Sequence, residues 1–138
     1  MYSHIMVPVD LAHAEQLHKA LQTSADLAKL YQASVCYVGV SASTPSSIAH
    51  TPEEFSSKME EFSQAQAAKH QLSNVSSATY ISHDPTADLD DTLMRAASET
   101  GADLVVMASH VPGVMEHIFA SNAGYFASFA KVSVLVVR

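Results

Sequence analysis

Residues 105–138 read VVMASHVPGVMEHIFASNAGYFASFAKVSVLVVR, and this stretch indicates the fold more clearly than any other. An apolar segment leads into a small polar one, a Pro-Gly turn, and the triplet Ala120-Ser121-Asn122, which suits the start of a helix. A second apolar segment, VSVLVV, follows the helix. Strand, loop, helix and strand in succession make one crossover unit of a parallel sheet. The loop that enters the helix is a natural phosphate site, because backbone N–H groups without helical partners converge at a helix N-terminus.

The remainder of the chain alternates strand-like and helix-like segments in the same way. Strands are expected at His4–Val9, Ser34–Val40, Ser76–Ser82, Asp103–Ser109 and Val132–Val137. Apolar spacing and helix start and stop signals predict helices over His13–Tyr31, from Thr51 to about Gln71, from the turn Asp84-Pro85-Thr86 to Gly101, and from about Ala120 to Lys131. Five strands alternating with four helices predict an α/β protein. We expect a single doubly wound parallel sheet with two helices on each face.

The helix that starts near Thr51 has the clearest N-terminal signal in the chain. Thr51 can cap it, Pro52 fits its first position, and Glu54 completes a capping box. The acidic group at the next helix suits the positive end of the helix dipole; it consists of Asp84, Asp88, Asp90 and Asp91.

Length and composition limit what the chain can be. Its 138 residues, 48% hydrophobic, suit one domain that spans residues 1–138. The formal charge of −7 and the scattered basic residues argue against broad affinity for nucleic acid or anionic lipid. The single cysteine, Cys36, excludes an internal disulfide, and no apolar stretch is long enough for a membrane span. A cytoplasmic location is therefore expected.

Ligands of open parallel sheets bind beyond the carboxyl ends of the strands, where the winding direction reverses. If the strand order is 3-2-1-4-5, the reversal falls between the first and fourth strands. Asp10, which follows the first strand, would then face the segment Ser109–Asn122. Asp10 could equally cap the first helix or its preceding turn.

Two terminal motifs resemble the universal stress protein family. The opening HIMVPVD is similar to the family's first strand, which ends in an aspartate. The tail DLVVMASH…ASNA…SVLVVR is similar to its glycine-rich loop and final strand, and the number, order and length of the elements also match. The resemblance implies a doubly wound sheet of order 3-2-1-4-5, adenine nucleotide binding as in many members, and the dimeric state of most members.

By this resemblance, nucleotide-contacting roles pass to matching positions. Pro8, Val9 and Asp10 would border the adenine and ribose, and Val38 or Val40 would form part of the base pocket. Met107 and Ala108 would lie against the adenosine. The residues around the phosphates would be Ser109, His110, Gly113, Ala120, Ser121 and Asn122.

The phosphate motif departs from the family pattern. Its three glycine positions hold Ala108, Val111 and Ala120, and a Cβ at Ala120 could crowd a γ-phosphate. No lysine or arginine lies between Arg95 and Lys131. ATP is the ligand that the resemblance suggests, but AMP or ADP is expected to bind no worse, and Mg²⁺ only together with nucleotide. The alternative is a family member that has lost the nucleotide and acts as a protein-interaction module in the stress response.

Other features bear on catalysis, metals and partners. No P-loop or G-x-S-x-G motif is present, so no catalytic residue is expected, although slow ATP hydrolysis by a positioned water stays open. The spacing of the histidines predicts no metal site.

The apolar strand Val132–Val137 is expected at a sheet edge, where antiparallel pairing would form a homodimer. The aromatic residues of the last helix either pack on the sheet or meet an unknown protein partner; they are Tyr125, Phe126 and Phe129.

Overall fold

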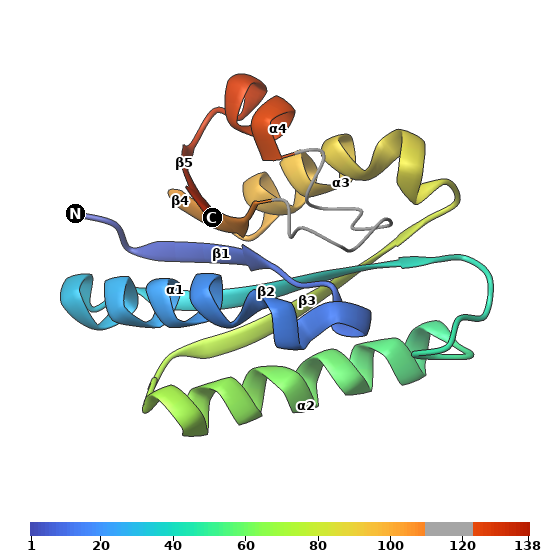
Figure 1. Cartoon of the computed structure of the whole chain (residues 1–138), viewed down its shortest axis with the longest axis horizontal. Coiled ribbons are helices and arrows are strands. Elements are labelled where there is room, and N and C mark those ends of the chain that lie inside the picture. Colours follow the sequence, from blue (N-terminus) through green and yellow to red (C-terminus); the bar gives the residue numbers. More distant parts are fainter. Residues whose placement is uncertain (110–122) are drawn as a thin grey trace.

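The computed structural model of the chain describes residues 1–109 and 123–138. Five parallel strands form one sheet in the order β3-β2-β1-β4-β5 (Figure 1). The strands are β1 (His4–Pro8), β2 (Ser34–Ala42), β3 (Val75–Ser82), β4 (Leu104–Ala108) and β5 (Ser133–Val137). The predicted α/β class and the strand order 3-2-1-4-5 are confirmed.

Helices cover both faces of this sheet, as expected. A 3₁₀ helix, η1 (Leu11–Leu17), precedes α1 (His18–Tyr31), and the later helices are α2 (Pro52–His70), α3 (Pro85–Glu99) and α4 (Ala123–Phe129). In Figure 1, α1 and α2 lie on one face and α3 and α4 on the other. The start predicted for the last helix, Ala120, lies outside the described residues.

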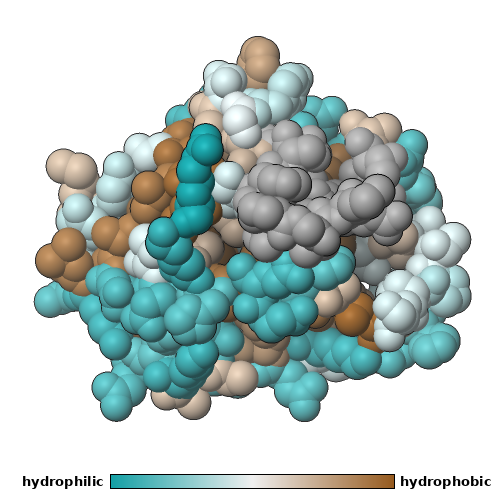
Figure 2. Space-filling view, in the orientation of Figure 1, coloured by the Kyte–Doolittle hydropathy of each residue, from teal (hydrophilic) through white to brown (hydrophobic). Residues whose placement is uncertain are grey.

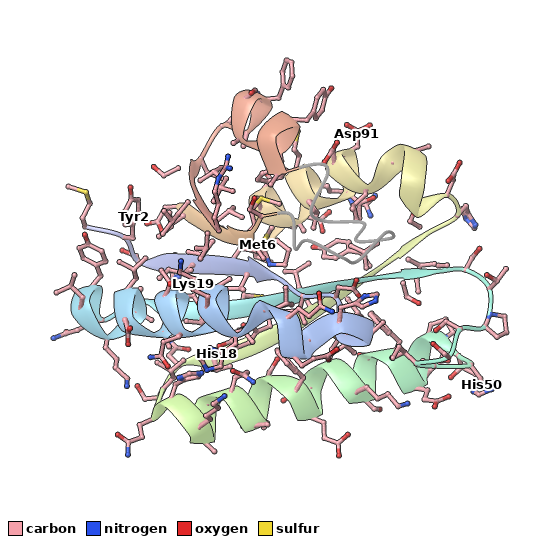
Figure 3. The ribbon with its side chains drawn as sticks, viewed as in Figure 1. Tyr2, Met6, His18, Lys19, His50 and Asp91 are labelled. Atoms are coloured by element: carbon pink, nitrogen blue, oxygen red, sulfur yellow. The ribbon has the colours of Figure 1, made fainter. Side chains whose placement is uncertain are left out.

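Two buried apolar clusters fill the space between the sheet and its helices. Successive residues of a strand point to opposite faces, so Ile5 and Val7 join the cluster under α1 and α2, while Met6 joins the one under α3 and α4 (Figure 3). Strands buried on both faces need apolar residues at every position, which explains the unbroken apolar run of β1.

The first helix differs from the prediction of one helix over His13–Tyr31. Leu11–Leu17 form a 3₁₀ helix with a break at His13 (φ −130°, ψ 31°), and α1 begins only at His18. The Asp10 carboxylate accepts hydrogen bonds from the Ala12 N–H at 3.1 Å and from the His13 ring at 2.9 Å. These side-chain bonds compete with regular α-helical pairing and tighten the first turns.

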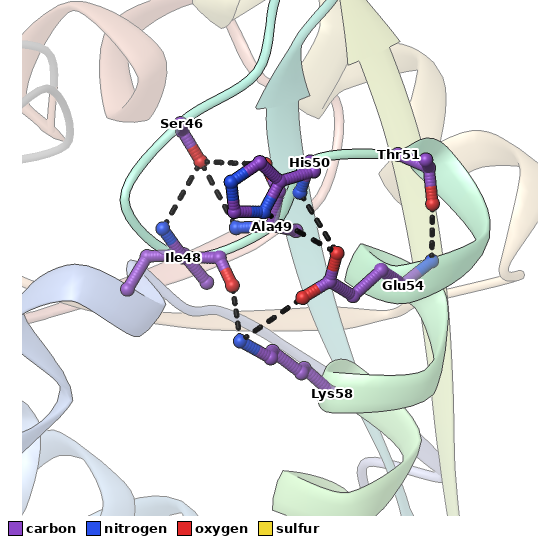
Figure 4. Close-up of polar contacts among 7 residues, drawn as sticks. All are labelled: Ser46, Ile48, Ala49, His50, Thr51, Glu54 and Lys58. Atoms are coloured by element: carbon purple, nitrogen blue, oxygen red, sulfur yellow. Dashed lines mark hydrogen bonds and ion pairs between the residues drawn. The ribbon is translucent and has the colours of Figure 1, made fainter.

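The start of α2 follows the sequence prediction closely (Figure 4). The Glu54 N–H donates to the Thr51 hydroxyl at 3.1 Å, and the Glu54 carboxylate accepts from the His50 N–H at 2.9 Å. The box therefore reaches one residue further back than the usual form. The His50 N–H also holds the pKa of Glu54 below its ordinary value. The Lys58 ammonium forms an ion pair with the Glu54 carboxylate at 3.5 Å and donates a hydrogen bond to the Ile48 carbonyl. These two contacts hold the preceding loop against the helix.

Within the parts of the chain described, no helix is both long and apolar enough to cross a bilayer.

Candidate functional site

The winding direction of the sheet reverses between the central strand β1 and its neighbour β4. Their register pairs Ile5 with Leu104 and Met6 with Val105. Asp10 follows Met6 by the same number of residues as Ser109 follows Val105. The two segments therefore leave the carboxyl edge of the sheet at the same level. A reversal point of this kind is where open α/β sheets bind ligands. The strand order therefore places the two exits at the same edge of the sheet, on neighbouring strands.

The exit of β1 is firmly held. Pro8 and Val9 are buried, and the Val9 N–H donates to the Val38 carbonyl at 2.8 Å, which extends the pairing with β2 beyond the end of β1. The capping role considered for Asp10 is confirmed by its bond to the Ala12 N–H. Its side chain is only 15% exposed, so its direction is fixed. A carboxylate oxygen has two lone pairs, so it can accept more than one hydrogen bond.

The residues expected around the base separate into two groups. Val38 and Met107 are buried in the cluster under α3 and α4. Val40 and Ala108 are partly exposed, and they pack against opposite faces of the sheet. Two of the four side chains are thus partly exposed, while the other two are buried.

The exit of β4 is tied to the last strand. The Ser109 N–H donates to the Val137 carbonyl at 2.7 Å, which continues the β4–β5 ladder by one residue. Ser109 is partly exposed. The other positions predicted around the phosphates lie outside the described residues; they are His110, Gly113, Ala120, Ser121 and Asn122.

One cationic residue at this edge was missed by the sequence analysis. The Lys19 ammonium, in the first turn of α1 (Figure 3), donates to the Arg138 carbonyl at 2.6 Å. Arg138 follows Val137, the residue that holds Ser109. The phosphate loop brings no cation of its own, but α1 places one beside the strand that the loop is tied to. Lys19 and Arg138 lie far apart in the chain, and no local pattern signals their contact.

The acidic start of α3 belongs to no metal-binding group within the described residues. Asp88 accepts a hydrogen bond from the Ser82 hydroxyl, and burial, followed by the charge of Asp91, raises the pKa of Asp90. Among residues 1–109 and 123–138, no three His, Cys, Asp or Glu side chains are grouped so that they could hold a metal ion.

Comparisons with known proteins identify the family to which the fold belongs. A family model described as the universal stress protein family matches residues 1–138. Universal stress protein G of Shigella flexneri is 29% identical over 143 aligned residues, which cover 100% of both chains. The universal stress protein of Archaeoglobus fulgidus, solved in complex with dAMP, superposes with a TM-score of 0.68 at 18% identity, over 99% of this chain and 98% of that one.

A universal stress protein family protein of Arabidopsis thaliana, solved with AMP bound, gives a TM-score of 0.64 at 14% identity, over 98% of this chain and 90% of that one. At such identities the structural likeness supports the fold alone, and the family model carries the assignment. The strand order, the aspartate after β1 and the match along the entire sequence agree, and the chain belongs to the universal stress protein family.

Proposed function

We propose that this chain is a regulatory protein that binds an adenine nucleotide where β1 and β4 part, and that it works as a homodimer. The main observation behind the proposal is that Asp10 and Ser109 leave neighbouring strands at the same level, where the winding direction of the sheet reverses. The dAMP and AMP complexes of the two structural relatives support the choice of an adenine nucleotide.

In the proposed complex, Asp10 accepts a hydrogen bond from a ribose hydroxyl. Its carboxylate is already oriented by Ala12 and His13, so little conformational freedom is lost on binding. Val40 and Ala108, which are partly exposed, contact the adenosine at the carboxyl edge of the sheet, each from its own face. Ser109 then begins the phosphate-binding segment, together with the sequence-predicted residues that follow it.

The number of phosphates should matter little. The motif has alanine or valine where glycine would let the backbone approach phosphate, and the phosphate loop itself contributes no lysine or arginine. The Lys19 ammonium already donates to a carbonyl, so it can offer a phosphate only its remaining N–H groups. We expect AMP and ADP to bind at least as tightly as ATP.

Isothermal titration calorimetry with AMP, ADP and ATP, with and without Mg²⁺, tests the proposal. Asp10→Asn keeps a good capping side chain but removes the charge, so it should weaken AMP binding about three- to tenfold, the difference between a charge-assisted and a neutral hydrogen bond. The same substitution should leave 2′,3′-dideoxy-AMP unaffected. Asp91→Asn, at an exposed position on the outside of α3, is the matched control (Figure 3). If no nucleotide binds at millimolar concentration, the proposal is wrong.

One observation favours a second function, that of a protein-interaction module. Tyr125 and Phe129 on α4 are 54% and 60% exposed, and their rings lie 4.5 Å apart. Exposed neighbouring aromatic side chains are typical of contact surfaces. The two functions separate in the titration, because a module that has lost its nucleotide gives no heat with AMP.

A further inference from the structure

A hollow lies at the amino edge of the sheet, opposite the edge of the proposed nucleotide site. It is a cavity of about 440 Å³ between the end of α3, α4 and the segment that enters β5. Gly101 and Ala102 precede β4, and Lys131 and Val132 precede β5, which places the cavity at the edge opposite Asp10 and Ser109. Its lining consists of Met94, Ala97, Ser98, Gly101, Ala102, Phe126, Phe129, Ala130, Lys131 and Val132.

The cavity is lined by small residues at the end of α3 and in the turn after it, whereas α4 contributes two phenylalanines. Ala97, Ala102 and Phe126 form a floor that is at most 8% exposed. Gly101 turns the chain after α3 with a φ of +68°, and a Cβ built on it would meet no atom within 4 Å. The floor is therefore apolar, while the space above it is left open by residues without long side chains.

The rim of the cavity is different from its floor. The Phe129 ring stands at the rim, 60% exposed and 4.5 Å from the Tyr125 ring. Lys131 and Ser98 are also exposed and supply an ammonium and a hydroxyl group. An apolar hollow with a few polar groups at its mouth is the usual form of a small-molecule site.

The charge at the mouth is positive although the chain carries −7. No carboxylate lines the cavity, and Lys131 takes part in none of the ion pairs recorded within the described ranges. The nearest acid along α3, Glu99, is held elsewhere, because it accepts from the Tyr80 hydroxyl at 2.7 Å and pairs with Arg95 at 3.9 Å. Lys131 is thus available to an anion.

We propose that this cavity binds a small amphipathic carboxylate, such as a medium-chain fatty acid. The apolar chain would lie over Phe126 and against Phe129, and the carboxylate would meet the Lys131 ammonium and the Ser98 hydroxyl. The volume of about 440 Å³ falls within the usual range of ligand sites, about 300–1,000 Å³.

Calorimetric titration of the full chain with hexanoate, octanoate and decanoate tests the proposal. Affinity should rise about fourfold for each methylene that enters the cavity. Decanoate should bind more tightly than decanol, and decyltrimethylammonium should bind least. Amide chemical shifts measured by NMR should move at Ala97, Gly101 and Lys131 while those of Val9 and Ser109 stay unchanged.

Two substitutions separate the cation from the apolar floor. Lys131→Gln should weaken decanoate about two- to fivefold, the usual range for an exposed ion pair, and leave decanol unaffected. Lys69→Gln makes the same charge change at an exposed position on α2, across the sheet, and should change neither. Ala130→Trp should fill the hollow and abolish binding of both ligands, with thermal unfolding as the check that the variant folds.

The proposal is overturned if decanoate causes no shifts at the cavity residues, if affinity does not depend on chain length, or if decanoate binds as well to Lys131→Gln as to the natural chain. None of these outcomes touches the nucleotide proposal, since Lys131→Gln should leave AMP binding intact.

Discussion

Gly39 shows how closely α2 packs on the sheet. A Cβ built on Gly39 would lie 2.7 Å from the Met59 sulfur and 2.9 Å from the Phe55 ring, and both side chains are buried. The glycine therefore sets the distance between β2 and α2. Phe55 and Met59 are spaced to lie on one face of α2, but only the structure shows that they meet a strand residue without a side chain.

Gly39→Ala is expected to destabilise the chain by about 1–3 kcal/mol, because the added methyl overpacks a closed core. Gly124→Ala is the matched control. Gly124 lies in α4, where an added methyl would have open space around it, and alanine there should stabilise by roughly 0.5–1 kcal/mol. Urea unfolding measures both free energies. Equal stability of Gly39→Ala and the natural chain would contradict this account of the packing.

His70, in the last turn of α2, is a buried histidine that sequence alone did not distinguish from the other seven. Burial lowers its pKa first, followed by the positive charges of Lys69 and Lys29 and that of His18, against the opposing charge of Asp26. Its Nε2 atom has no hydrogen-bond partner within the described ranges. The fold therefore favours the neutral ring.

Because the pKa of His70 is lower in the folded chain than in the unfolded one, the unfolded chain takes up the proton first as pH falls. Stability should thus decrease as pH drops below about 6.5, the ordinary histidine pKa, until the folded pKa is passed. His70→Phe should remove this part of the pH dependence, whereas His50→Gln, at an exposed position, should not. The free energy of unfolding in urea, measured from pH 8 to 5, checks this prediction. If it falls with pH equally in His70→Phe and in the natural chain, His70 contributes nothing to the pH dependence.

At the scale of elements, local signals predicted most helix ends. Thr51, Pro52 and Glu54 marked the start of α2, and Gly101 marked the end of α3. The break at His13 was missed, because it results from the side-chain bonds of Asp10 and not from an apolar pattern. The shared sheet edge of Asp10 and Ser109 followed from the strand order, but the contact between Lys19 and Arg138 depends on how α1 and β5 meet in space.

Thr51→Ala removes the hydroxyl that accepts the Glu54 N–H, so it should cost about 1 kcal/mol of stability. Thr51→Ser keeps an accepting hydroxyl and should lose at most a few tenths of that amount. Thr44→Ala, at an exposed position in the same loop, controls for the loss of a threonine methyl and hydroxyl. The urea unfolding midpoints of the three variants give their three changes in stability. A Thr51→Ala midpoint matching that of Thr44→Ala would mean that the cap adds nothing.

At the scale of the whole molecule, the two edges of the sheet differ. The β3 edge is rich in small polar residues, whereas β5 is almost entirely apolar. On the face shown in Figure 2, hydrophobic residues gather beside β5, and hydrophilic residues cover much of the area over α1 and α2. Leu135 is 38% exposed, and β5 ends the strand order of the described sheet. An edge of this kind favours pairing with another chain, which is the physical basis of the proposed homodimer.

Leu135→Glu tests the dimer directly. Around a twofold axis the two copies of a β5 residue approach one another, so the substitution would bring two carboxylates close together at an apolar contact. Light scattering at tens of micromolar should give twice the chain mass of 14.8 kDa for the natural chain and the single-chain mass for Leu135→Glu. Ile81→Glu, at a similarly exposed position on β3, should stay dimeric, because it places the same charge on the opposite edge. If the natural chain has the single-chain mass, there is no dimer. If Leu135→Glu remains dimeric, the dimer contact lies elsewhere than at β5.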